Sequence, residues 1–430
     1  MRPKISVIMP SYNVVNYIEA AVDSVRNQTM RDIEIICIDA GSNDGTLEKL
    51  IKIKNEDERV ILIDHFEKSY GKQVNRGMAI SRGDYLAIVE TDDYISSDML
   101  EILLKYGEMN NCDFVKGDYK AFWTQNNGEA VFLDRKTVTN EKLYNKCICP
   151  LDDYSLATSD WYLWTGIYRR DFIIENKIYF SETPGAAFQD IGFLHKTYVK
   201  AKKAYYVDKS FYNYCIDRVD SSSNIGKGID FSYYEYRRLF EEKWSYNEEK
   251  AIYCRMACFF SGCINGITVD DLHNKLVMEK FNWFLAKLSY AIQTDIINDK
   301  CIYKSIWETI YPLPKDMKNA YERNINKNDS LIDTIGKLRD INVFIFGCGT
   351  FGYYAYKWLV YHKYRISGYF DNNEDLWGKR INDIPVLPIE KIKSLGENDR
   401  VVIANEKYGD DIYNQLISAG VHASNISRFK

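Results

Sequence analysis

The first part of the chain alternates short apolar runs with stretches whose apolar residues recur at helical spacing. Four runs have the length and apolar content of buried strands: 4–9, 33–38, 59–63 and 85–89. After the first run, Ile18, Val22 and Val25 are placed to line one face of a helix. Strands that alternate with helices predict an α/β fold with a mainly parallel sheet and helices on both of its faces.

A second series of this kind occupies the end of the chain. Strands are predicted at 342–346, 366–370 and 400–404, with a helix at 353–361. The residues between the two series are rich in Tyr, Trp, Lys and Glu, and their apolar residues follow helical spacing. We therefore predict three parts: an α/β domain at 1–225, a helical connector at 226–335 and a small α/β domain at 336–430.

Composition narrows the class of protein. The chain has 430 residues, too many for a single core, and its 46% hydrophobic and 27% charged residues are typical of an ordered globular protein. The net charge of −5 argues against a nucleic-acid partner, which normally binds a basic surface. The ten cysteines lack the paired spacing of zinc sites, so we expect reduced, mostly buried thiols.

Two apolar segments bear on location. The run that follows Lys4 ends at Pro10 and is too short for a signal peptide. The longest uncharged run, 256–269, is broken by Gly and Asn and is too short to span a bilayer. We therefore expect a cytoplasmic protein.

Three acids directly follow the predicted strand at 85–89, in the sequence Glu90-Thr91-Asp92-Asp93. Carboxylates so close together repel one another unless a cation lies between them. The carboxyl end of a strand in an open parallel sheet is also where ligands bind. The loop therefore indicates a site for a divalent metal and a diphosphate. The alternative is an exposed acidic turn that caps the next helix.

Several loop motifs occur in a fixed order along residues 1–95. They are Pro10-Ser11-Tyr12-Asn13, Asp39-Ala40-Gly41-Ser42-Asn43-Asp44-Gly45-Thr46, Asn75-Arg76-Gly77, Gly83-Asp84-Tyr85 and Glu90-Thr91-Asp92-Asp93. Their order and spacing resemble those of the nucleotide-sugar domain of family 2 glycosyltransferases, which have the GT-A fold. The resemblance implies transfer of a sugar from a nucleoside diphosphate to an acceptor hydroxyl, with inversion at the anomeric carbon.

The resemblance also implies roles for the residues in these loops. Asp39 corresponds to an aspartate that accepts a hydrogen bond from uracil, which favours UDP; a helix-capping acid is the alternative. Asp92 and Asp93 are implied as ligands of Mn²⁺ or Mg²⁺, which would neutralise the departing diphosphate. The residues implied in donor binding are Pro10, Ser11, Tyr12, Asp39, Asn75, Glu90, Thr91 and Asp92.

Further along the chain, Phe188-Gln189-Asp190-Ile191 resembles the Glu-Asp segment of the family. Asp190 is therefore implied as the general base that takes the proton of the acceptor hydroxyl. Its apolar neighbours would raise its pKa toward the working range. The alternative for Asp190 is an ordinary acid at the start of a helix.

The chain departs from the pattern of the family at three positions. Ala40 replaces a second acid, Glu90 replaces an aspartate, and Gln189 replaces a glutamate. The aspartates that the resemblance implies in uracil binding, metal binding and catalysis are nevertheless all present. A protein that binds a nucleotide sugar without turning it over is therefore an alternative.

A glycine-rich turn opens the second α/β series. Gly347-Cys348-Gly349-Thr350-Phe351-Gly352 has the pattern G-x-G-x-x-G between a predicted strand and a predicted helix, and Asp371 follows the next strand. Such glycines let backbone N–H groups approach a phosphate, and the acid can bind ribose. The segment resembles the small Rossmann-like domains that accompany bacterial surface-sugar enzymes. It predicts a second nucleotide site at Gly347, Gly349, Gly352 and Asp371.

Other roles for this last segment stay open. It could be purely structural or form a homo-oligomer, or it could bind a nicotinamide cofactor for sugar modification. For the whole chain, we expect a metal-dependent inverting glycosyltransferase of bacterial surface polysaccharide or glycolipid synthesis. Its partners would be a nucleotide-sugar donor, with a UDP-sugar favoured, and a saccharide or lipid-linked saccharide acceptor. A lipid-linked acceptor would place the protein at the inner face of the membrane.

Overall fold

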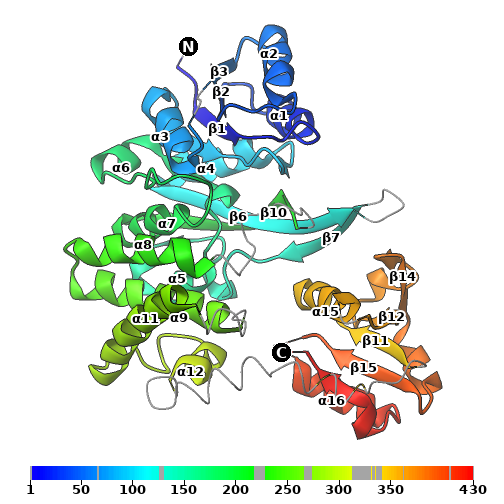
Figure 1. The fold of residues 1–430 in the computed structure, drawn as a ribbon. Helices are drawn as coiled ribbons and strands as arrows, with labels where there is room; N and C mark the ends of the chain where they lie inside the picture. The colour runs from blue at the N-terminus through cyan, green and yellow to red at the C-terminus, as the bar shows by residue number, and fades with distance from the viewer. Residues whose placement is uncertain are drawn as a thin grey trace. The chain divides into compact units, whose positions relative to one another are not determined.

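The computed structural model describes residues 2–64, 67–124, 130–216, 228–265, 274–311, 331, 335, 341–361, 363–405 and 408–429. The chain divides into two compact units. The first comprises Met1–Phe122 and Asp134–Met317, and the second comprises Trp123–Leu133 and Lys318–Lys430. Figure 1 shows the elements of both units.

One half of the sheet in the first unit is parallel. Its strands are β1 (Ile5–Ser11), β2 (Ile33–Asp39), β3 (Val60–Asp64) and β4 (Tyr85–Ile88), in the order β3-β2-β1-β4. All seven residues of β1 and of β2 are buried. This explains why both strands are apolar runs without alternation, as expected of strands covered on both faces. The α/β fold predicted from the sequence is confirmed here.

Helices α1 (Ile18–Arg26), α2 (Thr46–Glu56) and α3 (Tyr70–Ile80) follow β1, β2 and β3 along the chain (Figure 1). The face of α1 that was predicted from its apolar spacing is buried. Helix α3 lies so close to the sheet that a Cβ atom on Gly77 would be 2.6 Å from Cγ2 of Ile8. Gly77 therefore permits this close packing, which accounts for the glycine in the Asn75-Arg76-Gly77 motif.

Strand directions are mixed in the other half of this sheet. Strand β9 (Gly166–Arg169) pairs antiparallel with β4 and with β6 (Phe114–Thr124). Strand β10 (Ala204–Cys215) runs parallel to β6 and pairs antiparallel with β5 (Tyr94–Ile95) and β8 (Cys147–Ile148). Strand β7 (Ala130–Arg135) pairs with β6. The order therefore continues as β4-β9-β6-β10-β5.

The predicted connector is helical in the part that the structure describes. Its helices are α8 (Gly228–Glu241), α9 (Tyr246–Asn265), α11 (Lys275–Gln293) and α12 (Lys304–Ile310). They lie within the first unit, where α8 and α9 pack against α7 (Asp190–Lys200). Other described α-helices of this unit are α4 (Met99–Asn110), α5 (Ser155–Ser159) and α6 (Arg170–Glu175). The boundary predicted at 225/226 lies outside the described residues, and the division into three parts stays a prediction.

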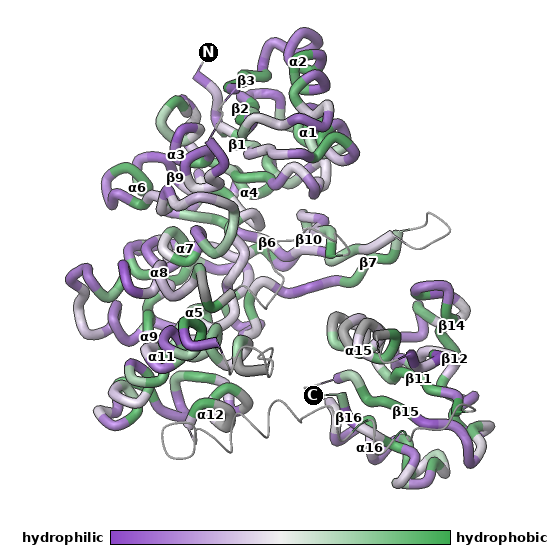
Figure 2. The backbone as a smooth tube through the Cα atoms, viewed as in Figure 1, coloured by the Kyte–Doolittle hydropathy of each residue, from purple (hydrophilic) through white to green (hydrophobic). Residues whose placement is uncertain are grey.

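The helices carry hydrophobic and hydrophilic residues in alternating stretches, as Figure 2 shows along α2 and α11. In α11, Phe281, Phe284 and Leu288 are buried whereas Leu276 is exposed. This is the pattern of helices that cover a core on one side only. Within the described ranges, no helix is long and apolar enough to cross a bilayer.

The second unit contains a sheet of order β13-β14-β12-β11-β15-β16. Its strands are β11 (Asn342–Phe346), β12 (Ile366–Phe370), β13 (Arg380–Ile381), β14 (Ile384–Leu387), β15 (Asp399–Ile403) and β16 (Ile426–Arg428). Every described pair except β13–β14 is parallel. Helices α15 (Thr350–Tyr361) and α16 (Gly409–Ser418) complete this α/β unit. Its core includes Phe346, Phe370 and Leu416.

Candidate active site

The carboxyl ends of β1 and β2 lie side by side, because Ser11 pairs in register with Asp39. The buried side chain of Gln73 fixes both ends from α3. Its Nε2 donates to the main-chain oxygens of Ser11 at 3.0 Å and of Ile38 at 2.7 Å. The strand order therefore brings the first two predicted donor loops together. Gln73 is not part of any sequence motif, although it lies two residues before the motif that begins with Asn75.

Asp39 is fully buried and bonds to its own loop. Its Oδ2 accepts hydrogen bonds from the N–H groups of Gly41 at 2.9 Å and Ser42 at 2.8 Å, and its Oδ1 accepts one from Ser42 Oγ at 2.5 Å. The residue that precedes α2 is Gly45, so Asp39 does not cap that helix. Asp39 thus shapes the loop, and its contact with uracil stays a prediction.

The first loop is joined to the acidic loop after β4. Thr91 Oγ1 donates to the main-chain oxygen of Pro10 at 2.8 Å. Lys68 Nζ lies 4.2 Å from the centre of the Tyr12 ring, within the range of a cation–π interaction. Pro10, Tyr12 and Thr91, which were predicted to bind the donor, therefore occupy one region. Lys68 adds a positive charge beside Tyr12, and no sequence motif marked this residue.

The three acids of the acidic loop are in different environments. Glu90 Oε1 accepts a hydrogen bond from Tyr70 OH at 2.6 Å. Asp93 is buried, and its two oxygens accept from Tyr212 OH at 3.0 Å and from the N–H of Cys215 at 2.8 Å. Burial, and then the neighbouring charge of Asp92, raises the pKa of Asp93. Asp92 remains partly exposed.

This arrangement bears on the metal site. The bonds of Asp93 to β10 favour a structural role over the predicted role of a second metal ligand. In the part of the chain that the structure describes, no three His, Cys, Asp or Glu side chains are grouped so as to hold a metal ion. The predicted cation surrounded by all three acids is therefore not a preformed site there. The residue of this loop best placed to meet a metal is Asp92.

Asn75 bonds to another part of the protein. Its Nδ2 donates to the main-chain oxygen of Phe180 at 2.9 Å and to Glu182 Oε1 at 3.0 Å. Its Oδ1 accepts from the N–H of Phe180 at 3.0 Å. Since both donors and the acceptor are used, this geometry favours a link between α3 and the segment 178–182 over the predicted donor binding.

Asp190 is the first residue of α7, and Phe188 just before it has a left-handed backbone with φ of 61°. Positive φ at a bulky residue is rare and marks backbone strain, which is common at functional sites. Burial raises the pKa of Asp190 to about 6, against the opposing effects of the N–H groups at the start of α7 and of the charge of Arg255. Asp190 is thus an acid at the start of a helix, which was the alternative stated from the sequence. Its raised pKa also suits a general base.

Gln189 explains how the Asp190 segment is held in place. Its Oε1 accepts from the N–H of Gly71 at 2.8 Å, and its Nε2 donates to Thr183 Oγ1 at 2.8 Å. The backbone adds two bonds, because Gly185 N–H donates to Lys68 O at 2.7 Å and Tyr70 N–H donates to Gly185 O at 2.8 Å. An amide accepts and donates at once, which an ionised glutamate does not. The departure at residue 189 therefore suits this loop.

Tyr70 joins the two halves of the site. Its hydroxyl donates to Glu90 at 2.6 Å. Burial is the main cause that raises the pKa of Tyr70, and the charges of Glu90 and Asp190 raise it further. The structure therefore brings the acidic loop and Asp190 to one region. No motif in the sequence marked Tyr70, and a tyrosine at a helix start gives no signal by itself.

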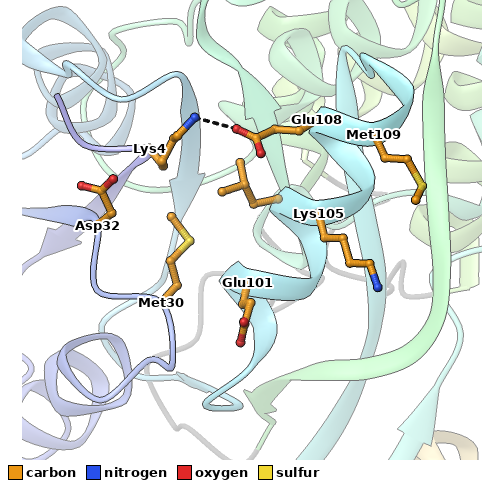
Figure 3. A pocket seen from close by; sticks show the side chains of 8 residues that line it. Lys4, Met30, Asp32, Glu101, Lys105, Glu108 and Met109 are labelled. Carbon is orange, nitrogen blue, oxygen red and sulfur yellow. Dashed lines mark hydrogen bonds and ion pairs between the residues drawn. The ribbon is translucent and has the colours of Figure 1, made fainter.

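A pocket lies at the opposite end of the parallel strands (Figure 3). It is lined by Lys4, Met30, Asp32, Glu101, Leu104, Lys105, Glu108 and Met109. Lys4 precedes β1, whereas the candidate site follows the carboxyl ends of the strands. The Lys4 ammonium bonds to Glu108 at 2.8 Å in this pocket, and none of the predicted site residues lines it.

The glycine-rich turn of the second unit is closely packed. Gly347 has φ of 116°, and a Cβ atom there would be 2.6 Å from the main-chain oxygen of Ala404. A Cβ atom on Gly352 would be 2.0 Å from the main-chain oxygen of Gly347. Asp371 accepts a hydrogen bond from the N–H of Cys348 at 2.7 Å, so it occupies a donor that a phosphate would need. Nucleotide binding at Gly347, Gly349, Gly352 and Asp371 stays a prediction.

Comparison with known families assigns two segments. Residues 6–149 match the model of the glycosyl transferase family 2, and residues 339–427 match the model described as C2185-like, N-terminal. The first match includes the acidic loop but ends before Asp190.

Several curated relatives are glycosyltransferases by name. The cholesterol galactosyltransferase of Borreliella burgdorferi is 24% identical over 333 residues, which are 74% of this chain and 84% of that protein. The uncharacterized glycosyltransferase EpsJ of Bacillus subtilis is 29% identical over 215 residues, 50% of this chain. The chain spans 61% of the length of EpsJ.

Two further comparisons concern one more curated relative and one solved structure. The poly(ribitol-phosphate) beta-glucosyltransferase of Bacillus spizizenii is 33% identical over 207 residues, which are 46% of this chain and 30% of that protein. The crystal structure of S. aureus TarS 1–349 in complex with UDP-GlcNAc aligns with a TM-score of 0.56 and 18% identity. That alignment covers 77% of this chain and 91% of TarS 1–349. The motif order, the strand order and these matches agree: residues 6–149 are similar to the glycosyl transferase family 2, and the chain shares the GT-A-like fold of TarS.

Proposed function

We propose that this protein is an inverting glycosyltransferase that moves a sugar from a nucleoside diphosphate, UDP in particular, to an acceptor hydroxyl. The observation that carries the proposal is the first turn of α3, where Tyr70 OH donates to Glu90 of the acidic loop and the N–H of Gly71 donates to Gln189, the residue before Asp190. A transferase needs its leaving-group site and its general base on either side of one sugar. This turn ties the elements that carry these two groups to each other.

The reaction follows from the positions of these groups. The donor diphosphate would lie against the loops after β1, β2 and β4, which contain Pro10–Tyr12, Asp39 and Glu90–Asp92. Asp190 would accept the proton of the acceptor hydroxyl as that oxygen forms its bond to the anomeric carbon. The bond from that carbon to the diphosphate oxygen breaks on the opposite face, so the configuration inverts. With its pKa raised to about 6, Asp190 is ionised near neutral pH and is a stronger base than an exposed aspartate.

We propose that a divalent cation, Mn²⁺ or Mg²⁺, is held by Asp92 together with the phosphates of the donor. Such ions often take only one or two carboxylates from the protein and complete their coordination with substrate phosphates and water. Asp92 is partly exposed and lies next to the buried Asp93, whereas the partly exposed Glu90 accepts a hydrogen bond from Tyr70, so a single carboxylate at Asp92 fits this mode. The cation would stabilise the negative charge on the departing diphosphate. Asp93 would hold the loop through β10.

The donor and acceptor classes rest on the relatives. TarS has been crystallised with UDP-GlcNAc and with UDP, which supports a UDP-sugar as donor. Two relatives are named for transfer to cholesterol and to a poly(ribitol-phosphate), so a lipid hydroxyl and a polymer hydroxyl are both within the range of similar enzymes. We therefore place the protein in surface polysaccharide or glycolipid synthesis, with a saccharide or lipid-linked saccharide as acceptor.

The test is a transfer assay on the full chain with UDP-, GDP-, CMP- and dTDP-sugars, each with and without Mn²⁺. Asp92→Ala and Asp190→Ala should each lower kcat/KM by at least about a thousandfold while the protein stays folded. Asp171→Ala is the control, because Asp171 lies on α6 with a side chain that is 66% exposed. Near-normal rates in both site variants would contradict the proposal.

A further inference from the structure

Arg255 is a buried cation that lies on α9 and is 1% exposed. Its Nη1 donates to the main-chain oxygen of Asp160 at 2.9 Å, and its guanidinium lies 4.8 Å from the centre of the Trp161 ring. Among the residues that the structure describes, no carboxylate forms an ion pair with Arg255, and its Nε has no hydrogen-bond partner. Burying a charge without an ionic partner costs free energy, because the charge loses its hydration.

The carboxylate of Asp160 is already neutralised. Lys116 Nζ donates to both of its oxygens, at 2.7 and 2.9 Å, and Tyr206 OH donates to it at 2.7 Å. Lys116 and Asp160 thus form a buried pair without net charge. The charge of Arg255 is in excess of that pair, and its field extends to other groups in the low-dielectric interior.

Asp190 is the partly exposed acid at the start of α7, the helix that packs against the helix of Arg255. Helix α7 begins at Asp190, packs against α9, and carries Tyr198, whose ring centre is 6.0 Å from the Arg255 guanidinium. Phe188, two residues before Asp190, packs edge-on against Phe259, one turn after Arg255 on α9, with ring centres 5.4 Å apart. The titratable groups that interact electrostatically with Asp190 are Tyr70 of α3, Tyr168 of β9, Glu235 and Tyr236 of α8, and Arg255 of α9. Within the described part of the chain, Arg255 is the cation of this set.

The anionic member of the set has its own partner. Glu235 forms an ion pair with Arg238 at 2.5 Å. Tyr168 donates its hydroxyl to the main-chain oxygen of Leu163 at 2.6 Å. Asp190 and Arg255 are therefore the two facing charges that lack an ion pair of their own among the described residues.

We propose that Arg255 is a positioning residue for the general base, and that its buried positive charge keeps the Asp190 carboxylate ionised and directed to the acceptor. The role in transfer rests on the proposed function, whereas the coupling of the two charges rests on their positions. A neighbouring opposite charge lowers the pKa of a carboxyl by about one unit or more. Neutralising Arg255 should therefore make Asp190 protonate at a higher pH.

The first measurement is the pH dependence of kcat/KM for the wild type, Arg255→Gln and Arg255→Lys. Gln keeps a donor for the Asp160 oxygen but removes the charge, and Lys keeps the charge. In Arg255→Gln we expect the acidic limb of the profile to move up by about one pH unit, so that the rate falls about tenfold near pH 5 but changes little near pH 8. Arg255→Lys should stay within a few tenths of a unit of the wild type.

The second measurement needs no turnover. The carboxyl carbons of aspartate are labelled with ¹³C in the full chain, and the Asp190 signal is assigned by its loss in Asp190→Asn. Its midpoint should lie near pH 6 in the wild type and rise by about one unit in Arg255→Gln. If Arg255→Gln does not fold, Arg255→Met is used in its place as a second neutral variant. The same shift of the Asp190 midpoint is expected.

Arg169→Gln is the matched control, because Arg169 is a partly buried cation that pairs with Asp113 and does not face Asp190. Its Asp190 midpoint should match the wild type. A folded neutral variant of Arg255 whose midpoint and acidic limb both stay in place would overturn the inference. If the wild type transfers no sugar from any donor, the proposed function fails instead, and the titration alone decides the charge coupling.

Discussion

Asp39 and Asp93 are both held by hydrogen bonds from the protein, Asp39 within its own loop and Asp93 from strand β10. Both lie at the strand ends where the apolar pattern and the motifs placed them. The direction of each side chain depends on partners that the pattern does not reveal. The hydrogen-bond partners of Asp93 are Tyr212 and Cys215, which lie more than a hundred residues away in the sequence. The acidic loop was predictable from the sequence, whereas the separate roles of its acids required the structure.

Replacing Asp190 by Asn should stabilise the protein near neutral pH while it abolishes transfer. The folded state raises the pKa of Asp190 from 3.8 to about 6, so ionisation of this group destabilises the fold. The penalty is fully present above pH 6 and is lost as the pH falls from about 6 to about 4. Because the side chain is partly exposed, we expect the variant to gain about 1–2 kcal/mol at pH 7.

Urea unfolding of Asp190→Asn and the wild type at several pH values checks this prediction. The difference in the free energy of unfolding should shrink as the pH is lowered toward 4. A difference that does not vary with pH would show that Asp190 has an ordinary pKa and would weaken its assignment as general base.

Gln189→Glu tests why this chain departs from its family at that position. A glutamate at 189 could still accept from the N–H of Gly71, but it could not donate to Thr183. We expect a loss of about 1–2 kcal/mol in the free energy of unfolding at pH 7, because Thr183 loses its donor and gains a negative charge beside its oxygens. Equal stability of the two proteins would argue that the amide has no special role.

At the scale of elements, the site depends on how α3 holds the segment 178–190. Helix α3 begins at Tyr70, five residues before the Asn75-Arg76-Gly77 motif. Ser69 caps this helix by accepting a hydrogen bond from the N–H of Lys72. The first turn of α3 thus contains Tyr70, Gly71 and Gln73, and each makes a contact described above. Apolar periodicity could not reveal that turn, because its residues face the site and not a continuous core.

Asn75→Ala should loosen the link between α3 and the Asp190 segment. The variant leaves the N–H and the main-chain oxygen of Phe180 without their partner, which should cost about 1–3 kcal/mol of stability. We also expect kcat/KM to fall about tenfold or more, since a general base that is poorly held loses catalytic geometry. Amide hydrogen exchange should report faster opening of residues 178–190.

Asn110→Ala serves as the matched control for that variant. Asn110 bonds only to the main-chain oxygen of Tyr106 within its own helix, among the contacts that the structure describes. In Asn110→Ala, the amide hydrogen exchange of residues 178–190 and the kcat/KM should equal those of the wild type. If Asn75→Ala shows wild-type exchange, kcat/KM and donor KM, the link between α3 and the Asp190 segment is unimportant. A rise in the donor KM alone would support the predicted role of Asn75 in donor binding.

At the scale of the whole molecule, the α/β class of both units was predictable because buried parallel strands are short apolar runs that the turn residues separate clearly. The grouping of α8, α9, α11 and α12 was not predictable in this way. Amphipathic spacing shows that a helix has a buried face but not which element covers it. These helices belong to the first unit, and α8 and α9 pack against the helix that begins with Asp190.

Removal of metal should leave the stability of the whole chain unchanged while it stops transfer. In the described residues no preformed group of three ligands is present, and we propose that Asp92 meets the cation together with the donor phosphates. Mn²⁺ alone should therefore shift the thermal midpoint very little, and UDP alone only modestly. Mn²⁺ and UDP together should raise it by more than the sum, since a ligand at about a hundred times its Kd stabilises the folded state by about 2.7 kcal/mol. The extra rise should vanish in Asp92→Ala and persist in Asp171→Ala. A large shift with Mn²⁺ alone would instead mean that the chain holds a complete metal site without the donor.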